Sequence, residues 1–186
     1  MITDHAIAVL AAGGARALSH QAVDRAAGLA TGSTSYYFRS RRDLVAATIR
    51  RIREHSRAAF DASPVPEKIT PAGAATFMES QLHRLAGHRR EHALAVFSLL
   101  PEVEDDPELR KQLSSCLFSR DRAATLIDAL GGRDPGGTAM DLVDLLTGVL
   151  FGLLFGERRD EGVGAAPIAE TLRRFLTVAI ADVTVG

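Results

Sequence analysis

The sequence predicts an all-α protein of about nine helices, and three observations support this prediction. No segment alternates apolar and polar residues between turn residues, as half-buried strands do. Apolar residues instead recur at spacings of three and four, the period of a helix that buries one face. Short polar stretches rich in glycine and proline separate these segments. With 186 residues and 46% hydrophobic content, the chain can bury a sizeable core.

Four helices are predicted in the first third of the chain, at residues 3–12, 21–27, 32–38 and 41–62. Side-chain oxygens suited to capping precede or open three of them, those of Thr3, Ser19 and Ser40. Gly13-Gly14 is expected to end the first helix, and Gly28 the second, because glycine readily takes the left-handed conformation after a helix. The stretch "SPVPEKITP" ends the fourth helix.

Five more helices are predicted, at residues 72–86, 90–100, 107–130, 138–155 and 167–183, with breaks at "LPEVEDDP", "GGRDPGG" and "GERRDEGVGAAP". The last two are unusually apolar, and Gly148, Gly152 and Gly156 would let another helix approach closely. Large exposed apolar faces mark partner sites. We therefore predict a homodimer through helices 138–155 and 167–183. The alternative is that both helices pack inside one chain.

The formal net charge of −1 hides an uneven distribution. Residues 1–57 carry nine arginines and four carboxylates, a net charge of +5, and the rest of the chain carries −6. Positive charge gathered at one end attracts polyanions. The charges therefore indicate an anion-binding N-terminal region on an acidic body.

A helix-turn-helix is predicted where helices 21–27 and 32–38 are joined by Gly28-Leu29-Ala30. In this motif the second helix enters the major groove of DNA. Its exposed positions are predicted to be small or polar enough to meet base edges or phosphates, and they are Thr31, Ser33, Thr34, Ser35 and Tyr36.

Residues 6–44, "AIAVLAAGGARALSHQAVDRAAGLATGSTSYYFRSRRDL", resemble the DNA-binding domain of the TetR family of bacterial transcription regulators. The similarity runs without a gap through Gly14, Leu18-Ser19, Ala22-Val23, Ala27-Gly28-Leu29, Gly32-Ser33, Tyr37-Phe38, Ser40-Arg41 and Leu44. It implies a DNA-binding domain at 1–45, and a ligand-binding domain at 46–186 that dimerises through the last two long helices. It also implies a repressor that binds a palindromic DNA operator as a dimer and is released by a small molecule.

The predicted DNA contacts follow from position. Gly32 and Ser33 would offer backbone N–H groups and a hydroxyl to phosphate or a base edge, because the start of a helix is positive. Tyr37 resembles the family's phosphate-contacting aromatic, with its ring packed and its hydroxyl outward, and Phe38 is expected to hold the short helix to the core. The other predicted contacts can donate hydrogen bonds to bases or phosphates, and they are Ser19, His20, Gln21, Thr31, Thr34, Ser35, Tyr36, Arg39, Arg41 and Arg42.

Three positions depart from the family pattern. The usual hydroxyl cap before the recognition helix is Ala30, the frequent lysine before glycine is Thr31, and the usual "LY" pair is Thr34-Ser35. Thr31 or Ser33 is expected to supply the cap instead. DNA specificity is expected to differ from that of relatives at this hydroxyl-rich stretch.

A small-molecule site is predicted between helices 72–86, 90–100 and 107–130, where a ligand would shift the long helix 41–62. Its candidate lining residues are apolar or weakly polar, and they are Phe77, Met78, Leu82, His83, Leu85, Val96, Phe97, Leu100, Leu113, Cys116, Leu117, Phe118 and Leu126. The default interpretation of most of them, and of the lone Cys116, is plain core.

Other classes of function find little support in the sequence. His83, His88 and His92 do not form a convincing metal site, no cofactor is expected, and no catalytic triad or phosphate-cradling loop stands out. Asp4 and His5 interrupt any secretion signal, so a cytoplasmic protein is expected. The apolar run 142–155 falls short of the roughly 20 residues that cross a bilayer and is predicted to be a buried helix. The alternative function is a helical ligand-binding or adaptor protein without DNA affinity, and a helical enzyme ranks third.

Overall fold

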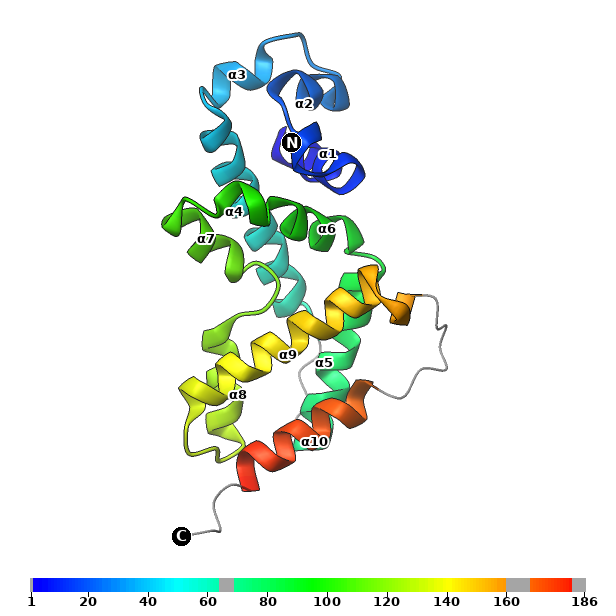
Figure 1. Ribbon diagram of the computed structural model, residues 1–186, viewed down its shortest axis with the longest axis vertical. Helices are drawn as coiled ribbons and strands as arrows, with labels where there is room; N and C mark the ends of the chain where they lie inside the picture. Colours follow the sequence, from blue (N-terminus) through cyan, green and yellow to red (C-terminus); the bar gives the residue numbers. More distant parts are fainter. Residues whose placement is uncertain (1, 64–68, 160–167, 182–186) are drawn as a thin grey trace. The chain divides into compact units, whose positions relative to one another are not determined.

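The computed structural model describes residues 2–63, 69–159 and 168–181, which form ten α-helices and two short 3-10 helices and contain no strand (Figure 1). The all-α prediction is therefore confirmed. The α-helices are α1 (Ile2–Ala17), α2 (His20–Ala27), α3 (Ser33–Tyr37), α4 (Arg41–Asp61), α5 (Pro71–Ala86), α6 (Arg90–Leu99), α7 (Pro107–Ser114), α8 (Arg120–Ala129), α9 (Pro135–Phe155) and α10 (Ile168–Ala181). The 3-10 helices are η1 (Leu100–Val103) and η2 (Glu157–Arg159).

Side-chain caps open six of these helices. In each, a hydroxyl or carboxylate oxygen accepts the backbone N–H three residues ahead, which satisfies a donor that has no partner inside the helix. The capping residues are Ser19, Ser40, Thr70, Asp106, Ser119 and Asp134. The Asp43 carboxylate in turn accepts the Ser40 N–H, and the two bonds together form a capping box at the start of α4. The predicted caps Ser19 and Ser40 are confirmed.

Two helix predictions were wrong in detail. The first helix begins at Ile2 and runs to Ala17, with Thr3 inside its first turn rather than at its cap. Gly14, at φ 69° and ψ −173°, is not helical and divides α1 into two helical segments, so the predicted break at Gly13-Gly14 is present. The predicted helix 107–130 is split into α7 and α8, and Ser119 begins the second of them by accepting the Arg122 N–H as its cap.

Some sequence expectations concern residues outside the described ranges. They are most of "SPVPEKITP" (64–68), most of "GERRDEGVGAAP" (160–167) and the last positions of the predicted helix 167–183. The described part of that helix is α10.

The chain packs as two compact units. In the first, formed by residues 2–63 and 89–117, α1 packs on α6, α2 and α4, and α4 also packs on α6 and α7. Its core is a continuous apolar cluster that includes Leu10, Leu18, Leu44, Ile49, Ile52, Leu99 and Leu113. The helix-turn-helix therefore shares one core with α4, α6 and α7. A functional boundary at residues 45 and 46 remains a prediction.

The second unit contains α5, α8, α9 and α10, in which α9 packs on α8 and α5, and α10 packs on α5 (Figure 1). The buried stripe of α9 recurs every three or four residues, at Ala139, Leu142, Leu146, Leu150 and Leu154. Met140, Phe151 and Phe155 on the same helix, and Val178 on α10, are exposed.

α9 differs from the predicted buried helix. It begins at Pro135, has 21 residues, and contains an 18-residue window with a mean hydropathy of 1.7, so it is long and apolar enough to cross a bilayer. Only 28% of its most apolar window is buried. One such helix is weak evidence for a membrane span, because helices at the core of water-soluble proteins meet the same criteria.

Candidate DNA-binding interface

The turn between α2 and α3 depends on two glycines in left-handed conformations. Gly28, at φ 64°, follows α2, and its N–H donates to Arg25 O. Gly32, at φ 93°, precedes α3. A side chain at either position would be strained, since left-handed backbone places Cβ too close to the following carbonyl. The predicted helix-turn-helix is present, and its turn places glycines at the two positions where the backbone is left-handed.

A buried carboxylate of α2 holds α3 in place. Asp24 is 2% exposed, and its Oδ2 accepts the Gly32 N–H at 2.8 Å. Its Oδ1 accepts the Thr34 N–H at 2.7 Å and the Thr34 hydroxyl at 2.6 Å. The bond from the Thr34 hydroxyl is the main reason why the pKa of Asp24 lies below its ordinary value. Asp24, on α2, thus accepts the backbone N–H groups at the start of α3.

This contact revises three predictions about α3. Neither Thr31 nor Ser33 caps the helix, because the N-cap is Gly32 and the capping acceptor is Asp24. Thr34 is fully buried, so its hydroxyl belongs to the helix junction and not to the exposed face. The Gly32 N–H is already bonded and is not available to a phosphate.

Asp24 was absent from the sequence-based site. Two signals pointed to it. The usual capping hydroxyl is replaced by Ala30, and a carboxylate follows Val23 on the buried side of α2. A buried carboxylate needs donors, and the uncapped start of the next helix supplies them.

The outward face of α3 carries two exposed aromatic rings. Tyr36 is 81% exposed and Tyr37 is 66% exposed, and the rings meet edge to face with centroids 5.3 Å apart. The expectation that the Tyr37 ring is packed was therefore wrong, because the neighbour of the ring is Tyr36. Phe38 packs against the core of the first unit, which confirms its predicted role.

The hydroxyls beside these rings make local bonds. Ser33 Oγ donates to Ala30 O at 2.7 Å, and Ser35 Oγ donates to Gly32 O at 2.9 Å. Each oxygen retains lone pairs that can accept a bond from a base. Thr31 and Ser35 are exposed. The outward face therefore consists of two rings and a few short hydroxyl side chains.

The start of α2 lies close to the end of α3. A ring nitrogen of His20, Nε2, is 2.7 Å from Phe38 O and donates to it, since a carbonyl only accepts. Ser19 Oγ accepts the Ala22 N–H at 3.1 Å, while Gln21 is exposed. His20 therefore helps to join the two helices, and Ser19 and Gln21 are the two exposed residues among the three predicted flanking contacts.

The three arginines that precede and open α4 differ in their surroundings. Arg41 donates to Ala15 O at 2.7 Å, to Leu18 O, and to Glu102 on η1 at 2.8 Å. Arg42 pairs with Asp106, the cap of α7, at 2.7 Å. Arg39 is exposed and forms no ion pair with any residue that the structure describes. All three arginines of the predicted cluster are exposed, but Arg41 and Arg42 already bind carboxylates.

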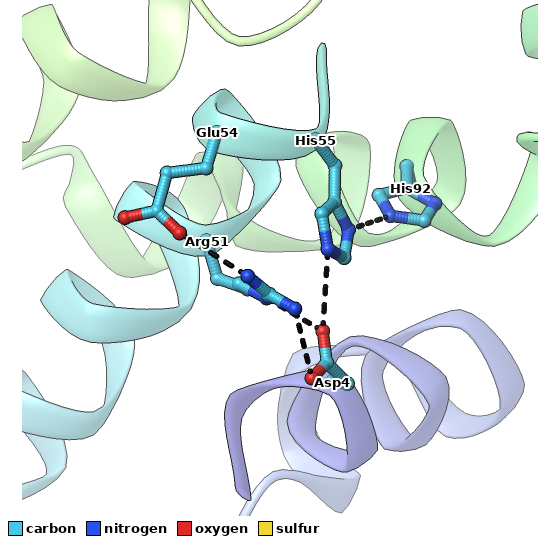
Figure 2. Close-up of polar contacts among 5 residues, drawn as sticks. All are labelled: Asp4, Arg51, Glu54, His55 and His92. Atoms are coloured by element: carbon cyan, nitrogen blue, oxygen red, sulfur yellow. Dashed lines mark hydrogen bonds and ion pairs between the residues drawn. The ribbon is translucent and has the colours of Figure 1, made fainter. Parts of the chain in front are cut away.

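A second polar cluster joins α1, α4 and α6 (Figure 2). His55 Nδ1 is 2.7 Å from His92 Nε2, and His55 Nε2 is 3.5 Å from Asp4 Oδ1. Arg51 donates to both Asp4 oxygens, at 2.7 and 3.3 Å, which lowers the pKa of Asp4 to about 2. Burial lowers the pKa of His92 to about 4. The cluster links the first helix to α4 and α6 through neutral imidazoles.

The predicted ligand-lining residues are divided between the two units. Val96, Leu113 and Cys116 belong to the core of the first unit, and Leu117 packs against it. Burial raises the pKa of the Cys116 thiol to about 12. Leu100 is 52% exposed, and Phe97 is half-buried. The structure thus assigns three predicted lining residues to core packing.

In the second unit, Met78, Leu82 and Leu85 are buried, Phe77, Phe118 and Leu126 are half-buried, and His83 is exposed. An open hollow of about 440 Å³ is lined by His83, Arg84, Gly87 and His88 at the end of α5. No group of three or more metal-ligating side chains occurs in the described part of the chain.

Two family sequence models match this chain. The model described as "Bacterial regulatory proteins, tetR family" matches residues 2–48. The model described as "Tetracyclin repressor-like, C-terminal domain" matches residues 69–180. No curated protein matches the chain.

Solved structures are similar over nearly the whole chain. A TetR-family member from Streptomyces coelicolor A3 is 26% identical, with a TM-score of 0.70 over 96% of this chain and 95% of that chain. The multidrug binding protein EbrR, in complex with imidazole, is 27% identical, with a TM-score of 0.69 over 96% of this chain and 92% of that chain. A transcriptional regulator from Rhodococcus sp. Rha1 is 18% identical with a TM-score of 0.79, covering 96% and 94%, and shows the fold alone.

Proposed function

This chain belongs to the TetR family of bacterial transcription regulators, and we propose that it is a repressor that binds a palindromic DNA operator as a homodimer and releases it when a small molecule binds. The observation that carries the proposal is the helix-turn-helix, in which a rigidly held α3 presents Tyr36 and Tyr37 outward. These rings and hydroxyls can contact thymine methyl groups, base edges and phosphates.

The proposed DNA surface combines α3 with its flanks. Its members are predicted residues that are exposed or half-buried and that are not held by a carboxylate or by the contacts between α2 and α3, namely Ser19, Gln21, Thr31, Ser33, Ser35, Tyr36, Tyr37 and Arg39. Positive charge in the first 57 residues would raise the affinity of this surface for DNA, because phosphates that are neutralised by the protein release their counterions. A cytoplasmic location fits a protein that acts on bacterial DNA.

The proposed dimer uses α9 and α10. Phe151 and Phe155 are 53% and 46% exposed, and their rings lie 5.2 Å apart. Gly148 is exposed with open space where a Cβ would stand, so a partner helix can approach there. Gly152 instead lies against Arg158 of η2. Phe151→Glu would place a charge on the apolar face, and sedimentation should then show a monomer. If this variant remains a dimer, the interface lies elsewhere on the protein.

The proposed effector is an apolar or aromatic compound held by the second unit. EbrR has been solved in complex with malachite green and with ethidium, at 26% identity and TM-scores of 0.69. The predicted lining residues that lie in the second unit are Phe77, Met78, Leu82, Leu85, Phe118 and Leu126, with His83 at its surface. These two dyes are the first compounds to titrate against the protein bound to DNA.

The test of the function is selection of DNA from a pool of random duplexes. Selection should return a palindrome, and its affinity measured by fluorescence anisotropy should fall by about a thousandfold between about 50 and 200 mM salt. A helical adaptor without DNA affinity would select nothing. Dyes that leave the affinity for DNA unchanged would remove the support for the proposed effector class, and DNA binding would remain established.

A further inference from the structure

The recognition helix cannot hold its own conformation. α3 has five residues, and its N-cap, Gly32, has no side chain with which to cap it. Short helices are unstable alone, and their first N–H groups need partners from outside the helix. Two N–H groups at the start of α3 donate to one carboxylate, that of Asp24, which lies ten residues before Thr34.

We propose that Asp24 is a positioning residue for DNA recognition, whose carboxylate fixes the orientation of α3 through Gly32 and Thr34 and thereby sets the outward direction of the two tyrosines. The proposal rests on the proposed function, since it concerns how the DNA surface is held. Asp24 is buried and does not itself contact DNA.

The three contacts require an ionised carboxylate. A carboxylate accepts on both oxygens and donates nothing, which matches the three donors that face it. An asparagine at this position would turn its NH2 group toward either the Gly32 N–H or the Thr34 N–H. One buried donor would then have no acceptor, and such a loss is costly.

The contacts also decide where DNA phosphates do not bind. Many helix N-termini bind phosphate through backbone N–H groups. In this protein the Gly32 and Thr34 N–H groups are occupied by Asp24, and the Ser33 N–H donates to Ala30 O at 3.1 Å. The carboxylate beneath them repels a second anion. The side chains on the outward face of α3 therefore make the contacts that recognise DNA. The direction in which these side chains point depends on Asp24.

The experiment compares affinity for the duplex that the wild-type protein selects with affinity for a scrambled duplex of the same length and composition. Asp24→Asn should lower affinity for the selected duplex by about tenfold and leave affinity for the scrambled duplex within about twofold. Thr34→Val should lower specific affinity by about threefold. Thr34→Ser keeps the hydroxyl and should bind within about twofold of wild type.

Asp43→Asn is the matched control. It removes the same charge from the same region and alters the capping box of α4 rather than the contacts of α3, so it should keep the ratio of specific to scrambled affinity. Partial unfolding would lower both affinities in proportion and leave the ratio unchanged.

Two results would overturn the proposal. One is an Asp24→Asn protein with the wild-type ratio of specific to scrambled affinity. If Asp24→Asn does not fold, a Thr34→Val protein with the wild-type ratio is equally decisive. A wild-type protein that selects no duplex overturns the proposed function itself, and this result is seen before any variant is made.

Discussion

The outward face of α3 and the start of α4 lie a few residues apart, and both were predicted from sequence to contact DNA. On α3, Tyr36 and Tyr37 extend away from the core. At the start of α4, the guanidinium groups of Arg41 and Arg42 bind Glu102 and Asp106, which lie more than 60 residues away in sequence. Both arginine side chains are exposed, at 42% and 59%, so the difference lies in their partners and not in their exposure. Charge in a sequence does not reveal whether a side chain is already paired within the protein. Neighbouring residues can serve recognition and architecture separately.

The largest effect on DNA affinity is expected at the two exposed tyrosines of α3. Tyr36→Ala together with Tyr37→Ala should lower affinity for the selected duplex by about 100-fold, because exposed aromatic side chains often dominate binding energy. Thermal unfolding should change little, since both rings are exposed. Anisotropy and circular dichroism measure the two quantities. Affinity within about threefold of wild type would place the reading surface elsewhere.

Arg41→Ala should act mainly on stability. Its guanidinium joins the end of α1, through Ala15 O and Leu18 O, to Glu102 on η1. Loss of these bonds should lower the free energy of unfolding by about 2 kcal/mol in urea titrations. Arg50→Ala, an exposed arginine of the same helix, is the control and should unfold like wild type. Unchanged stability in Arg41→Ala would show that these bonds contribute nothing.

Arg39 and Arg42 should differ in the salt dependence of DNA binding. Arg39→Ala should reduce the slope of log affinity against log salt by about 1 per protomer, because one phosphate contact is lost. Arg42→Ala should leave the slope unchanged, since Arg42 pairs with Asp106. If both variants reduce the slope equally, the Arg42–Asp106 pair opens when DNA binds.

Changes in the polar cluster of Figure 2 are expected to have the smallest effect on the protein at neutral pH. The pKa of His92 is lowered from 6.5 to about 4, and that of His55 is also lowered, mainly by burial. A histidine with a lowered pKa in the folded state contributes full stability above pH 6.5, and this contribution is lost as the pH falls toward 4. Asp4, with its pKa lowered from 3.8 to about 2, adds pH dependence only below about pH 4.

Thermal melts between pH 7 and pH 4 test this expectation. The His55–His92 bond needs one neutral ring, and the nearby charges that influence it are Asp4, Arg51, Glu54 and Arg89. His92→Gln should flatten the loss of stability in this window, whereas His5→Gln, at an exposed position of α1, should keep the wild-type slope. Equal slopes in all three proteins would contradict the prediction.

Much of the architecture could be predicted from local patterns. Three local features were recognised in the sequence because each depends on only a few neighbouring residues. They are the helix periodicity, the caps Ser19 and Ser40, and the turn at Gly28. The split of 107–130 was missed because Ser119, which caps α8, lies within a segment whose apolar spacing also fits one long helix. Thr34 was placed on the exposed face because the two signals for a buried carboxylate, Ala30 and the position of Asp24 after Val23, do not show which residue of α3 meets that carboxylate.

The sequence by itself determined that this protein is helical, that a helix-turn-helix lies near its N-terminus and that it resembles the TetR family, because these properties follow from short-range spacing. Only the tertiary structure decided which polar groups already have partners within the protein. Asp24 meets Thr34 across a turn, and Arg41 meets Glu102 across a distance of 61 residues in sequence. Such partners become visible when packing brings distant segments within hydrogen-bond range, since a hydrogen bond depends on distance in space and not on separation along the chain.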